Sequence, residues 1–474
     1  MSEATPPPKT VSEHSSDVSL FEAHKKIYPR SVSGWFANWR WAFVWFTQLL
    51  FYGLCWLPWN GRQAVLFNLA ERKFYIFGLI LWPQDVFYLA ILLIIAAYAL
   101  FLFTAIGGRL FCGYACPQTV YSEIFIWIEE KIEGDRSARM KLDRQPISTR
   151  KMGLKAAKHV IWIALGLWTG FTFVGYFTPI KTLASEVLSL RFALGPWETF
   201  WILFYGFATY GNAGWMREQV CKYMCPYARF QSAMFDPDTL IVTYDAERGE
   251  PRGARSKKLD YKAAGKGDCV DCGICVQVCP TGIDIRDGLQ YECIGCSACI
   301  DACDQVMDKM SYPRGLIRYS TEHAMQAKWG SKEIVKHVLR PRTIVYGVIL
   351  ALIIIVTAVA LTMRMPLKVD VIRDRVGQGR EEEHNMIENH YRLQIMNVSE
   401  APHRYLIGVT GLEGIFIESG NSIEIPALTT QSVSVEVYAP SESGKKGYHR
   451  IYFEVSSADE KKIAVREKSN FLIP

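Results

Sequence analysis

Residues 269 to 280 read "CVDCGICVQVCP" and residues 293 to 303 read "CIGCSACIDAC". Each run places four cysteines as C-x2-C-x2-C-x3-C, which is the spacing of bacterial ferredoxins that hold two [4Fe–4S] clusters. Two four-cysteine zinc sites are the alternative, because paired C-x2-C motifs also bind zinc. Eight cysteines in this double spacing favour iron and sulfur, so the sequence predicts a two-cluster ferredoxin segment.

The ferredoxin pattern is crossed, since the fourth cysteine of each run binds the cluster of the other run. It therefore assigns the cysteines to a first cluster set, Cys269, Cys272, Cys275 and Cys303, and a second cluster set, Cys293, Cys296, Cys299 and Cys279. Pro280 follows the first run as usual, whereas Asp304 stands where the second run would carry proline, which leaves the local turn open. Two clusters in one small segment predict a relay of single electrons.

Composition points to a membrane protein with sizeable soluble parts, since 50% of the 474 residues are hydrophobic and 21% are charged. Most of the thirteen cysteines follow ligand spacing and not a secreted disulfide framework, which predicts a reducing, cytoplasmic environment for them. The net charge of +6 is small, and basic residues flank apolar segments. Membrane-flanking charge is therefore expected, and nucleic-acid binding is not.

Five apolar segments are long enough to cross a bilayer, and a sixth stretch at 74–82 could be re-entrant or interfacial, so the span count is five or six. The predicted spans are 41–59, 86–107, 160–179, 197–214 and 343–363. Lys and Arg are dense between the second and third spans, which predicts that this side is cytoplasmic.

The expected organisation begins with a flexible cytoplasmic tail that carries no signal peptide. The segments are the tail at 1–34, a four-span membrane domain at 35–214, a cytoplasmic ferredoxin segment at 215–342, a fifth span at 343–363 and an outer domain at 366–474. We thus expect a multi-pass protein of the bacterial inner membrane. Its N-terminus and iron–sulfur segment face the cytoplasm, and its C-terminal domain faces the periplasm.

The outer segment alternates apolar and polar residues in runs such as "RYLIGVTG" and "SVSVEVYAP", separated by Gly, Pro, Ser and Asn. Some seven strands without cysteine predict an immunoglobulin-like β-sandwich. Ligand-type residues do not cluster in this stretch of sequence, so packing or docking of a partner is its expected role.

A second cysteine pattern occurs twice, as "FCGYACPQTV" at 111–120 and "VCKYMCPYAR" at 220–229. Cys112 with Cys116, and Cys221 with Cys225, are four residues apart, so on a helix both sulfurs of a pair would project from one face. The proline after each pair places it where one helix stops and another starts. We expect a parallel internal repeat in which the four thiols converge.

Four converging thiols would select a soft metal: Cu(I), zinc or an iron–sulfur cluster. A pair of thiols could hold Cu(I) at low coordination or form one end of a four-sulfur site. Simple packing at a span end is the alternative, because cysteine is among the more buried residue types.

With both cysteine patterns in view, the chain resembles the polyferredoxin membrane proteins, and among them the cytochrome c oxidase accessory family of CcoG, FixG and RdxA. The resemblance implies reduction of Cu(II) to Cu(I) on the cytoplasmic side, so that a copper chaperone and a copper-exporting ATPase can supply the assembly of cbb3-type oxidase. It implies two [4Fe–4S] clusters on the eight cysteines named above. A copper role at Cys112, Cys116, Cys221 and Cys225 is the further expectation.

Two other functions stay open from the sequence. One is a quinol-oxidising polyferredoxin that feeds another reductase, and the other is a scaffold that gathers oxidase assembly factors in the lipid bilayer. A homodimer is also open. The nine histidines offer no pair inside the predicted spans, and no C-x-x-C-H motif occurs, so haem is not expected.

Overall fold

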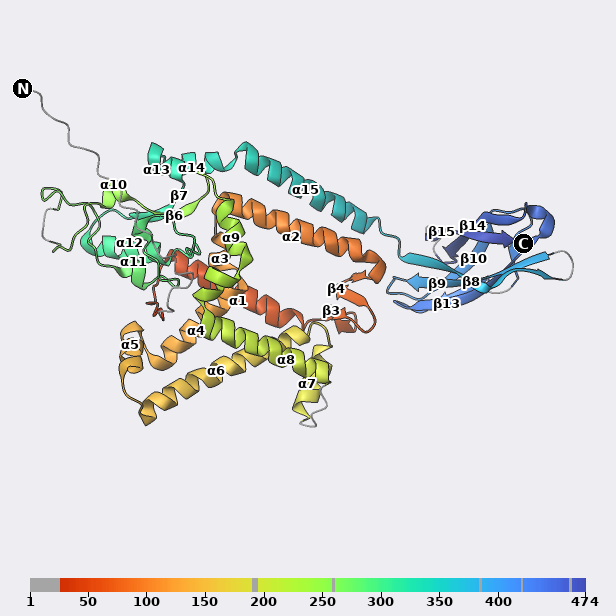
Figure 1. The fold of residues 1–474 in the computed structure, drawn as a ribbon, viewed down its shortest axis with the longest axis horizontal. Helices are drawn as coiled ribbons and strands as arrows, with labels where there is room; N and C mark the ends of the chain where they lie inside the picture. The colour runs from red at the N-terminus through yellow and green to blue at the C-terminus, as the bar shows by residue number, and fades with distance from the viewer. Residues whose placement is uncertain (1–25, 190–194, 258–260, 383–385, 419–420, 460–462) are drawn as a thin grey trace, which may run out of the picture. The chain divides into compact units, whose positions relative to one another are not determined.

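The computed structural model describes residues 26–189, 195–257, 261–382, 386–418, 421–459 and 463–474. The chain divides into two compact units, one formed by residues 1–79 and 96–348 and the other by residues 80–95 and 349–474 (Figure 1). Most of the predicted tail, residues 1–25, lies outside the described part. Residues 26–34 are placed against the rest of the first unit, which differs from the expected flexible tail.

Helices dominate the chain before the ferredoxin segment. They are α1 (Trp35–Leu54), α2 (Val86–Gly107), α3 (Leu110–Tyr114), α4 (Pro117–Glu133), α5 (Arg136–Arg144), α6 (Thr149–Val174), α7 (Ile180–Leu188), α8 (Pro196–Thr209), the π-helices η2 (Tyr210–Met216) and η3 (Val220–Met224), and α9 (Pro226–Ala233). A helix therefore lies at each of the first four predicted spans.

Three helical segments are long and apolar enough to cross a membrane, which supports a membrane protein by length and composition. They are Pro83–Gly107, Thr149–Val174 and Pro341–Thr362, the last being α15. Among the described residues, α1 and α8 do not meet the same criteria. α1 is rich in Trp and carries the buried Arg40, and α8 is only 14 residues long. Three of the five predicted spans are thus supported.

The chain between α1 and α2 differs from its prediction. α1 ends at Leu54, and the residues that follow form a hairpin of β1 (Pro58–Trp59) and β2 (Arg62–Gln63). Asn60 and Gly61 turn this hairpin with φ of 44° and 76°, which is the type of turn that Asn-Gly favours. The stretch at 74–82 is not a re-entrant piece, because most of it belongs to a small sheet of β3 (Val65–Asn68), β4 (Lys73–Ile76) and β5 (Leu79–Leu81).

α6 and α8 pack closely because α6 carries glycines one turn apart. A Cβ atom on Gly166 would lie 2.7 Å from the carbonyl oxygen of Gly206, and one on Gly170 would collide with the carbonyl oxygen of Ile202. Small residues four positions apart allow helix backbones to approach in this way in membranes. Larger side chains at either position would push the two helices apart.

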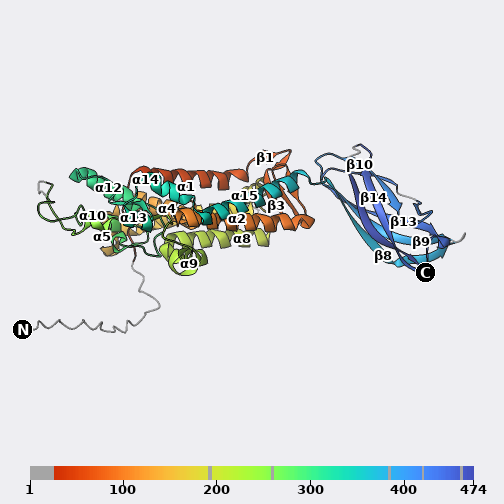
Figure 2. The ribbon, with the colours of Figure 1, turned by 90° about the horizontal axis from the view of Figure 1, so that it is seen from above.

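The ferredoxin segment follows α9 and is built from short elements. These are β6 (Ile241–Tyr244), α10 (Ala246–Gly249), α11 (Ile274–Gln277), η4 (Ile285–Asp287), α12 (Ala298–Met310), β7 (Ile317–Ser320), α13 (Glu322–Ala327) and α14 (Ser331–Val338). β6 pairs with β7 in an antiparallel ribbon. The Asp301 carboxylate of α12 accepts the backbone N–H groups of Phe36 and Ala37, so α12 lies at the first turn of α1 (Figure 2).

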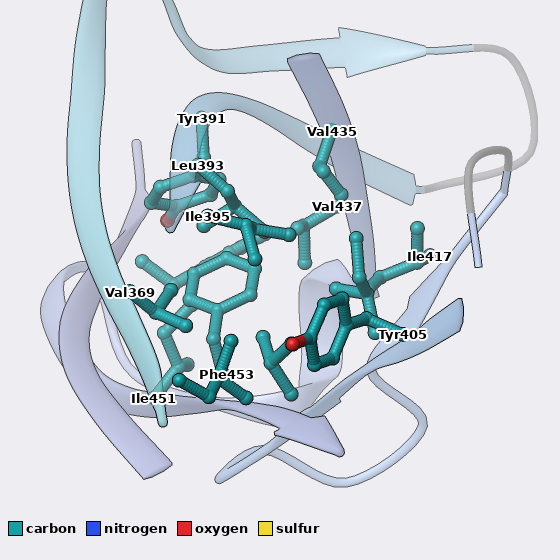
Figure 3. Packing of buried hydrophobic residues seen from close by; sticks show 14 of the residues in the cluster. Val369, Tyr391, Leu393, Ile395, Tyr405, Ile417, Val435, Val437, Ile451 and Phe453 are labelled. Carbon is teal, nitrogen blue, oxygen red and sulfur yellow. The ribbon is translucent and has the colours of Figure 1, made fainter. Parts of the chain in front are cut away.

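The second unit contains a β-sandwich, as predicted, with eight strands where some seven were expected. They are β8 (Leu367–Glu382), β9 (Met386–Asn397), β10 (His403–Thr410), β11 (Phe416–Ile417), β12 (Ser422–Ile425), β13 (Thr430–Pro440), β14 (Gly447–Ser457) and β15 (Ala464–Ile473). One sheet has the order β12-β10-β14-β15 and the other β11-β13-β9-β8. Alternate residues of both sheets fill the core (Figure 3). There the rings of Tyr391 and Phe453 meet edge to face, with their centroids 5.0 Å apart.

One expectation for the sandwich is wrong, because ligand-type side chains do cluster there. Strand pairing sets Glu436 opposite His390, and Glu388 lies two residues before His390 on the same face. The ligand atoms of these three residues lie within 4.8 Å of one another. The cluster was missed because it needs the register of β9 and β13, which the separate runs of sequence do not reveal.

Candidate electron-transfer and thiol site

The two Cys-x-Tyr-x-Cys-Pro motifs adopt the same local structure. Cys112 lies in α3 and Cys221 in the π-helix η3. Cys116 and Cys225 are extended, with ψ of 127° and 109°, and each caps a new helix that begins at the following proline. The predicted helix break is confirmed. The expected projection of both thiols from one helix face is wrong, because proline excludes the preceding cysteine from helical geometry.

The four motif thiols come together in the fold, from segments about 100 residues apart. Burial and the neighbouring Cys116 raise the pKa of Cys112 to about 12, and Cys221 and Cys225 contribute to the same shift. Burial, Cys116 and Cys225 likewise raise the pKa of Cys221 to about 11. Cys112 and Cys221 are therefore protonated at neutral pH, and a bound cation would be needed to hold these two as thiolates.

The spacing of the thiols limits what they can bind. Among the described residues, no three of these sulfurs lie within 4.8 Å of one another. A single ion bound by four cysteines would require closer sulfurs, since metal–sulfur bonds are about 2.3 Å long. The four-sulfur site for one ion is therefore not formed here, whereas a site built on two thiols stays open.

The structure brings cysteines of the two ferredoxin runs close to one another, and Cys275 of the first set also acts on the thiol of Cys299 in the second. Cys269, Cys272 and Cys275 act on the pKa of Cys303, which burial raises to about 12. Cys279 acts on the thiols of Cys293, Cys296 and Cys299, although it belongs to the other run. The structure thus brings together the residues that crossed ligation requires, and their role as cluster ligands stays a prediction.

Both cysteine loops use the same backbone device. Asp271 and Gly273 in the first loop, and Gly295 and Ser297 in the second, have φ between 54° and 66°. Two left-handed residues in each loop curl the chain so that its first three cysteines line one concave side. The open question at Asp304 is settled, because α12 runs on through it to Met310 and its carboxylate accepts the backbone N–H of Gly315 at 2.9 Å.

The second cluster set lies directly against the first motif. Cys112 packs in one buried cluster with Ile294 and Cys296. A Cβ atom on Gly113 would lie 2.8 Å from the carbonyl oxygen of Gly295 and 2.9 Å from that of Ile294. Cys221 belongs to the rim of the same cluster. Cys112 and Cys221 of the two motifs therefore pack in the same cluster as Cys296 of the second cluster set.

Replacement of Gly113 by alanine is expected to destabilise the folded protein by about 1–3 kcal/mol, because the added methyl would clash with two carbonyl oxygens. Thermal unfolding of the detergent-solubilised protein measures the change. Gly153→Ala, at an exposed position of α6, is the matched control, since a Cβ atom there meets nothing within 4 Å. Equal melting temperatures for the two variants would contradict the close contact.

Two arginines connect the helices to the second cluster set, and the sequence did not point to either. The Arg40 guanidinium donates to the carbonyl of Cys296 at 3.2 Å, and the Arg109 guanidinium donates to the carbonyl of Cys293 at 3.3 Å. Both side chains are buried. Positive charge held beside this set favours the more negative, reduced state of any cofactor bound there. Cys296 and Cys293 lie 256 and 184 residues away from Arg40 and Arg109, so local sequence gives no signal for these contacts.

The N-terminal residues just before α1 strap the ferredoxin segment to the helices. The backbone N–H of Arg30 donates to the carbonyl of Gln277 at 2.8 Å, and the Tyr28 hydroxyl donates to Asp143 at 2.6 Å. Arg139, fully buried, donates to the carbonyl of Pro29 at 2.5 Å. This strap explains why residues 26–34 are ordered although their composition is that of a tail.

A buried ion-pair network lies beside the second motif. The Glu129 carboxylate is 1% exposed and pairs with Arg217 at 2.6 Å, Lys158 at 3.4 Å and Arg139 at 3.6 Å. Burial alone would raise the pKa of Glu129, but Arg217 and Lys158 outweigh it and lower the pKa to about 2. The network joins α4, α5 and α6 to the turn after η2 and so fixes the entry to η3.

Comparison with known proteins gives three matching family models. Residues 216–322 match a 4Fe-4S dicluster domain, residues 89–134 match a 4Fe-4S binding domain, and residues 357–474 match the IG-like fold at the C-terminal of FixG. The first of these contains all eight ferredoxin cysteines, and the second contains Cys112 and Cys116. Iron–sulfur binding is therefore supported independently of spacing.

Three curated relatives align over most of the chain. Nitrogen fixation protein FixG of Rhizobium meliloti is 40% identical over 84% of this chain and 80% of its own length. Protein RdxA of Cereibacter sphaeroides is 38% identical, covering 90% of this chain and 91% of the relative. Protein RdxB of the same organism is 37% identical, covering 94% and 96%. The chain thus belongs to the FixG/RdxA family of iron–sulfur electron-transfer proteins.

Proposed function

We propose that this chain is a membrane-bound electron-transfer protein that reduces Cu(II) to Cu(I) on the cytoplasmic side and so supports copper delivery for assembly of cbb3-type cytochrome c oxidase. One observation supports the proposal: Cys112 lies in one buried cluster with Cys296 of the second cluster set, and Cys221 packs against the same cluster. Electrons and a soft metal would meet at that contact.

The chemistry of the two sites is complementary. A [4Fe–4S] cluster, when bound by either set of cysteines, supplies single electrons at low potential. Cu(II) as substrate gains one electron and becomes Cu(I), and no covalent bond in the protein needs to break. Sulfur ligands favour the soft Cu(I) product, and two thiols suffice for its low coordination number. The spacing of the motif thiols fits such a two-sulfur site better than a four-sulfur one.

Two adjoining cavities offer a way in for the ion. A cavity of about 360 Å³ is lined by His159, Glu218 and Trp215 among others, and a smaller one of about 40 Å³ reaches Cys221 and Cys296. Glu218 lines both cavities. Imidazole and carboxylate suit Cu(II), whereas sulfur suits Cu(I), so this order of side chains matches an ion that is reduced as it moves inward.

The proposed topology places the N-terminus and the ferredoxin segment in the cytoplasm and the sandwich in the periplasm of a bacterial inner membrane. Arg364 and Lys368, just after the last predicted span, would oppose the positive-inside rule. Both side chains pair with the buried Asp85 carboxylate, so one of their two positive charges is compensated within the second unit. A copper chaperone, a copper-exporting ATPase and oxidase assembly factors are the proposed partners.

Binding of Cu(I) to the motif thiols is expected to strengthen with pH. Cys112 and Cys221, with pKa values of about 12 and 11, are protonated at neutral pH and must each release a proton to bind metal. A two-thiol site should therefore gain about a hundredfold in apparent affinity per pH unit between pH 6.5 and 7.5. Competition with a Cu(I) chelator measures it, and an affinity that does not change with pH would contradict thiol ligation.

A second candidate, oxidation of a quinol, is favoured by one observation. A cavity of about 760 Å³ between α1, α4 and α6 is lined by five tryptophans, with Gln48 and Tyr52 as its polar members. An apolar ring with polar edges would fit such a lining. Quinol oxidation would be favoured if a short-chain quinol bleached the iron–sulfur absorbance of the purified protein and the Trp45→Ala variant lost this effect.

Copper reduction is tested directly by anaerobic capture of Cu(I) after addition of Cu(II) to the protein.

A further inference from the structure

The two cluster sets differ in their access to solvent. Cys272, in the first set, is exposed, whereas the other eleven cysteines of the ferredoxin runs and the motifs are buried or half-buried. The second set is enclosed by α3, α12 and the arginines described above. A protein that exchanges electrons with this chain from solution would therefore approach at Cys272.

A basic hairpin runs beside this exposed thiol. The backbone N–H of Cys269 donates to the carbonyl of Gly249, and the N–H of Gly253 donates to the carbonyl of Cys269, so the hairpin lies along the first cysteine loop. Residues 248–257 and 261–268, which we call the basic hairpin, contain six Lys or Arg and two Asp or Glu. The positive charge of the basic hairpin therefore lies beside the first cluster set and not beside the motif thiols.

The acidic groups near Cys272 are largely used within the protein. Asp268 pairs with Arg248 at 2.5 Å, and Asp271 pairs with Arg286 at 2.6 Å. Lys257, Lys262 and Lys266 are exposed. Within the described parts of the chain, no carboxylate lies at ion-pair distance from Lys257 or Lys266. The surface that faces solvent here is thus positive.

The hairpin also has a rigid base. The Arg255 guanidinium donates to the carbonyl of Gly267 at 2.6 Å and lies over the rings of Tyr261, at 4.7 Å, and Tyr312, at 5.4 Å. This packing holds the two arms of the hairpin together and fixes where its lysines emerge. A preorganised charged surface steers an oppositely charged partner at little entropic cost.

We propose that the basic hairpin is the docking surface for a small acidic one-electron carrier protein, which binds over Lys257, Lys262 and Lys266 with its redox group toward Cys272. The exchange moves one electron: the carrier is oxidised by one electron, the iron–sulfur segment is reduced by one, and no bond or proton moves. The inference rests on the electron-transfer role and not on copper.

A binding measurement on the full chain in detergent tests the docking, with an oxidised plant-type [2Fe–2S] ferredoxin as the acidic probe. The variant K257E/K262E/K266E is compared with K141E/K332E/K336E, which makes the same change in charge at exposed lysines of α5 and α14. We expect the hairpin variant to lose about tenfold or more in affinity and to show a shallower salt dependence, while the control stays within about twofold of the wild type. Iron content reports that each variant is folded.

Carbodiimide cross-linking gives a second readout, since it should join acidic residues of the probe to Lys257, Lys262 or Lys266. Equal losses in the two variants would overturn the proposal, because binding would then follow net charge alone. Binding of anionic lipid vesicles, but not of the ferredoxin, through the same lysines would also overturn it in favour of a membrane contact. Copper takes no part in these assays, so their failure is distinct from failure of the proposed copper reduction.

Discussion

A variant with serine at Cys112, Cys116, Cys221 and Cys225 is expected to reduce Cu(II) only at the background rate while it keeps its iron. Cys112 and Cys221 pack against Cys296 of the second cluster set, Cys116 and Cys225 lie near Cys112, and removal of all four takes away the soft ligands that favour Cu(I). None of the four belongs to the eight ferredoxin cysteines, so the ferredoxin segment should stay loaded. The rate of Cu(II) reduction is expected to fall by at least about a hundredfold, because the groups that bind the reacting ion are removed.

The measurement is the rate of Cu(I) capture by a chelator after anaerobic addition of Cu(II) to reduced protein, with iron determined on the same sample. Cys55→Ser serves as the matched control, because Cys55 is a lone cysteine that packs against Val174, Ile180 and Leu183. Unchanged rates in the four-serine variant would show that exposed iron–sulfur groups reduce copper directly and that the motifs serve packing.

Glu129→Gln is expected to cost about 3–5 kcal/mol of folding free energy, the largest stability effect that we anticipate for one substitution. The glutamine would leave Arg217, Lys158 and Arg139 buried without their shared carboxylate. Thermal unfolding in detergent at neutral pH measures the loss. Glu130→Gln, one residue further on, is the control, because the Glu130 carboxylate accepts the Ser31 hydroxyl in a half-exposed position and its replacement should cost less than about 1 kcal/mol.

The same carboxylate predicts a pH dependence. The pKa of Glu129 is depressed to about 2 in the folded protein from 4.5 in an unperturbed glutamate, so its contribution is fully present above pH 4.5. That contribution should disappear as the pH falls from about 4.5 toward 2, and the Glu129→Gln variant should lack this part of the acid transition. Equal destabilisation by Glu129→Gln and Glu130→Gln would contradict the network.

Cysteine spacing allowed the eight ferredoxin residues and their crossed grouping to be anticipated, because the ligand pattern is local and repeated. The pairing of the two motifs was also foreseen, from their shared Cys-x-Tyr-x-Cys-Pro sequence. The direction in which the two thiols of each pair project was not foreseen. Helical spacing had been assumed for both cysteines, although the second cysteine of each pair precedes a proline. Cys116 and Cys225 are extended, and this places each of them at the start of the next helix.

Contacts between distant segments lay beyond the sequence. Arg40 lies immediately before the first predicted span, and only the fold shows that it donates to the carbonyl of Cys296. The strap at 26–34 has the composition of a tail, yet backbone hydrogen bonds such as Arg30 to Gln277 hold it in place. The first predicted span extended too far because apolar character continues past Leu54, while the Asn-Gly turn at 60–61 ends the helical region.

The central claim, that the motif thiols receive copper as Cu(I), is tested most directly by X-ray absorption at the copper edge after anaerobic mixing of the reduced protein with one equivalent of Cu(II). We expect a Cu(I) edge and two sulfur neighbours in the wild type, and loss of the sulfur shell in the four-serine variant. A Cu(II) edge with nitrogen and oxygen neighbours, or a sulfur shell that persists without the four thiols, would contradict it.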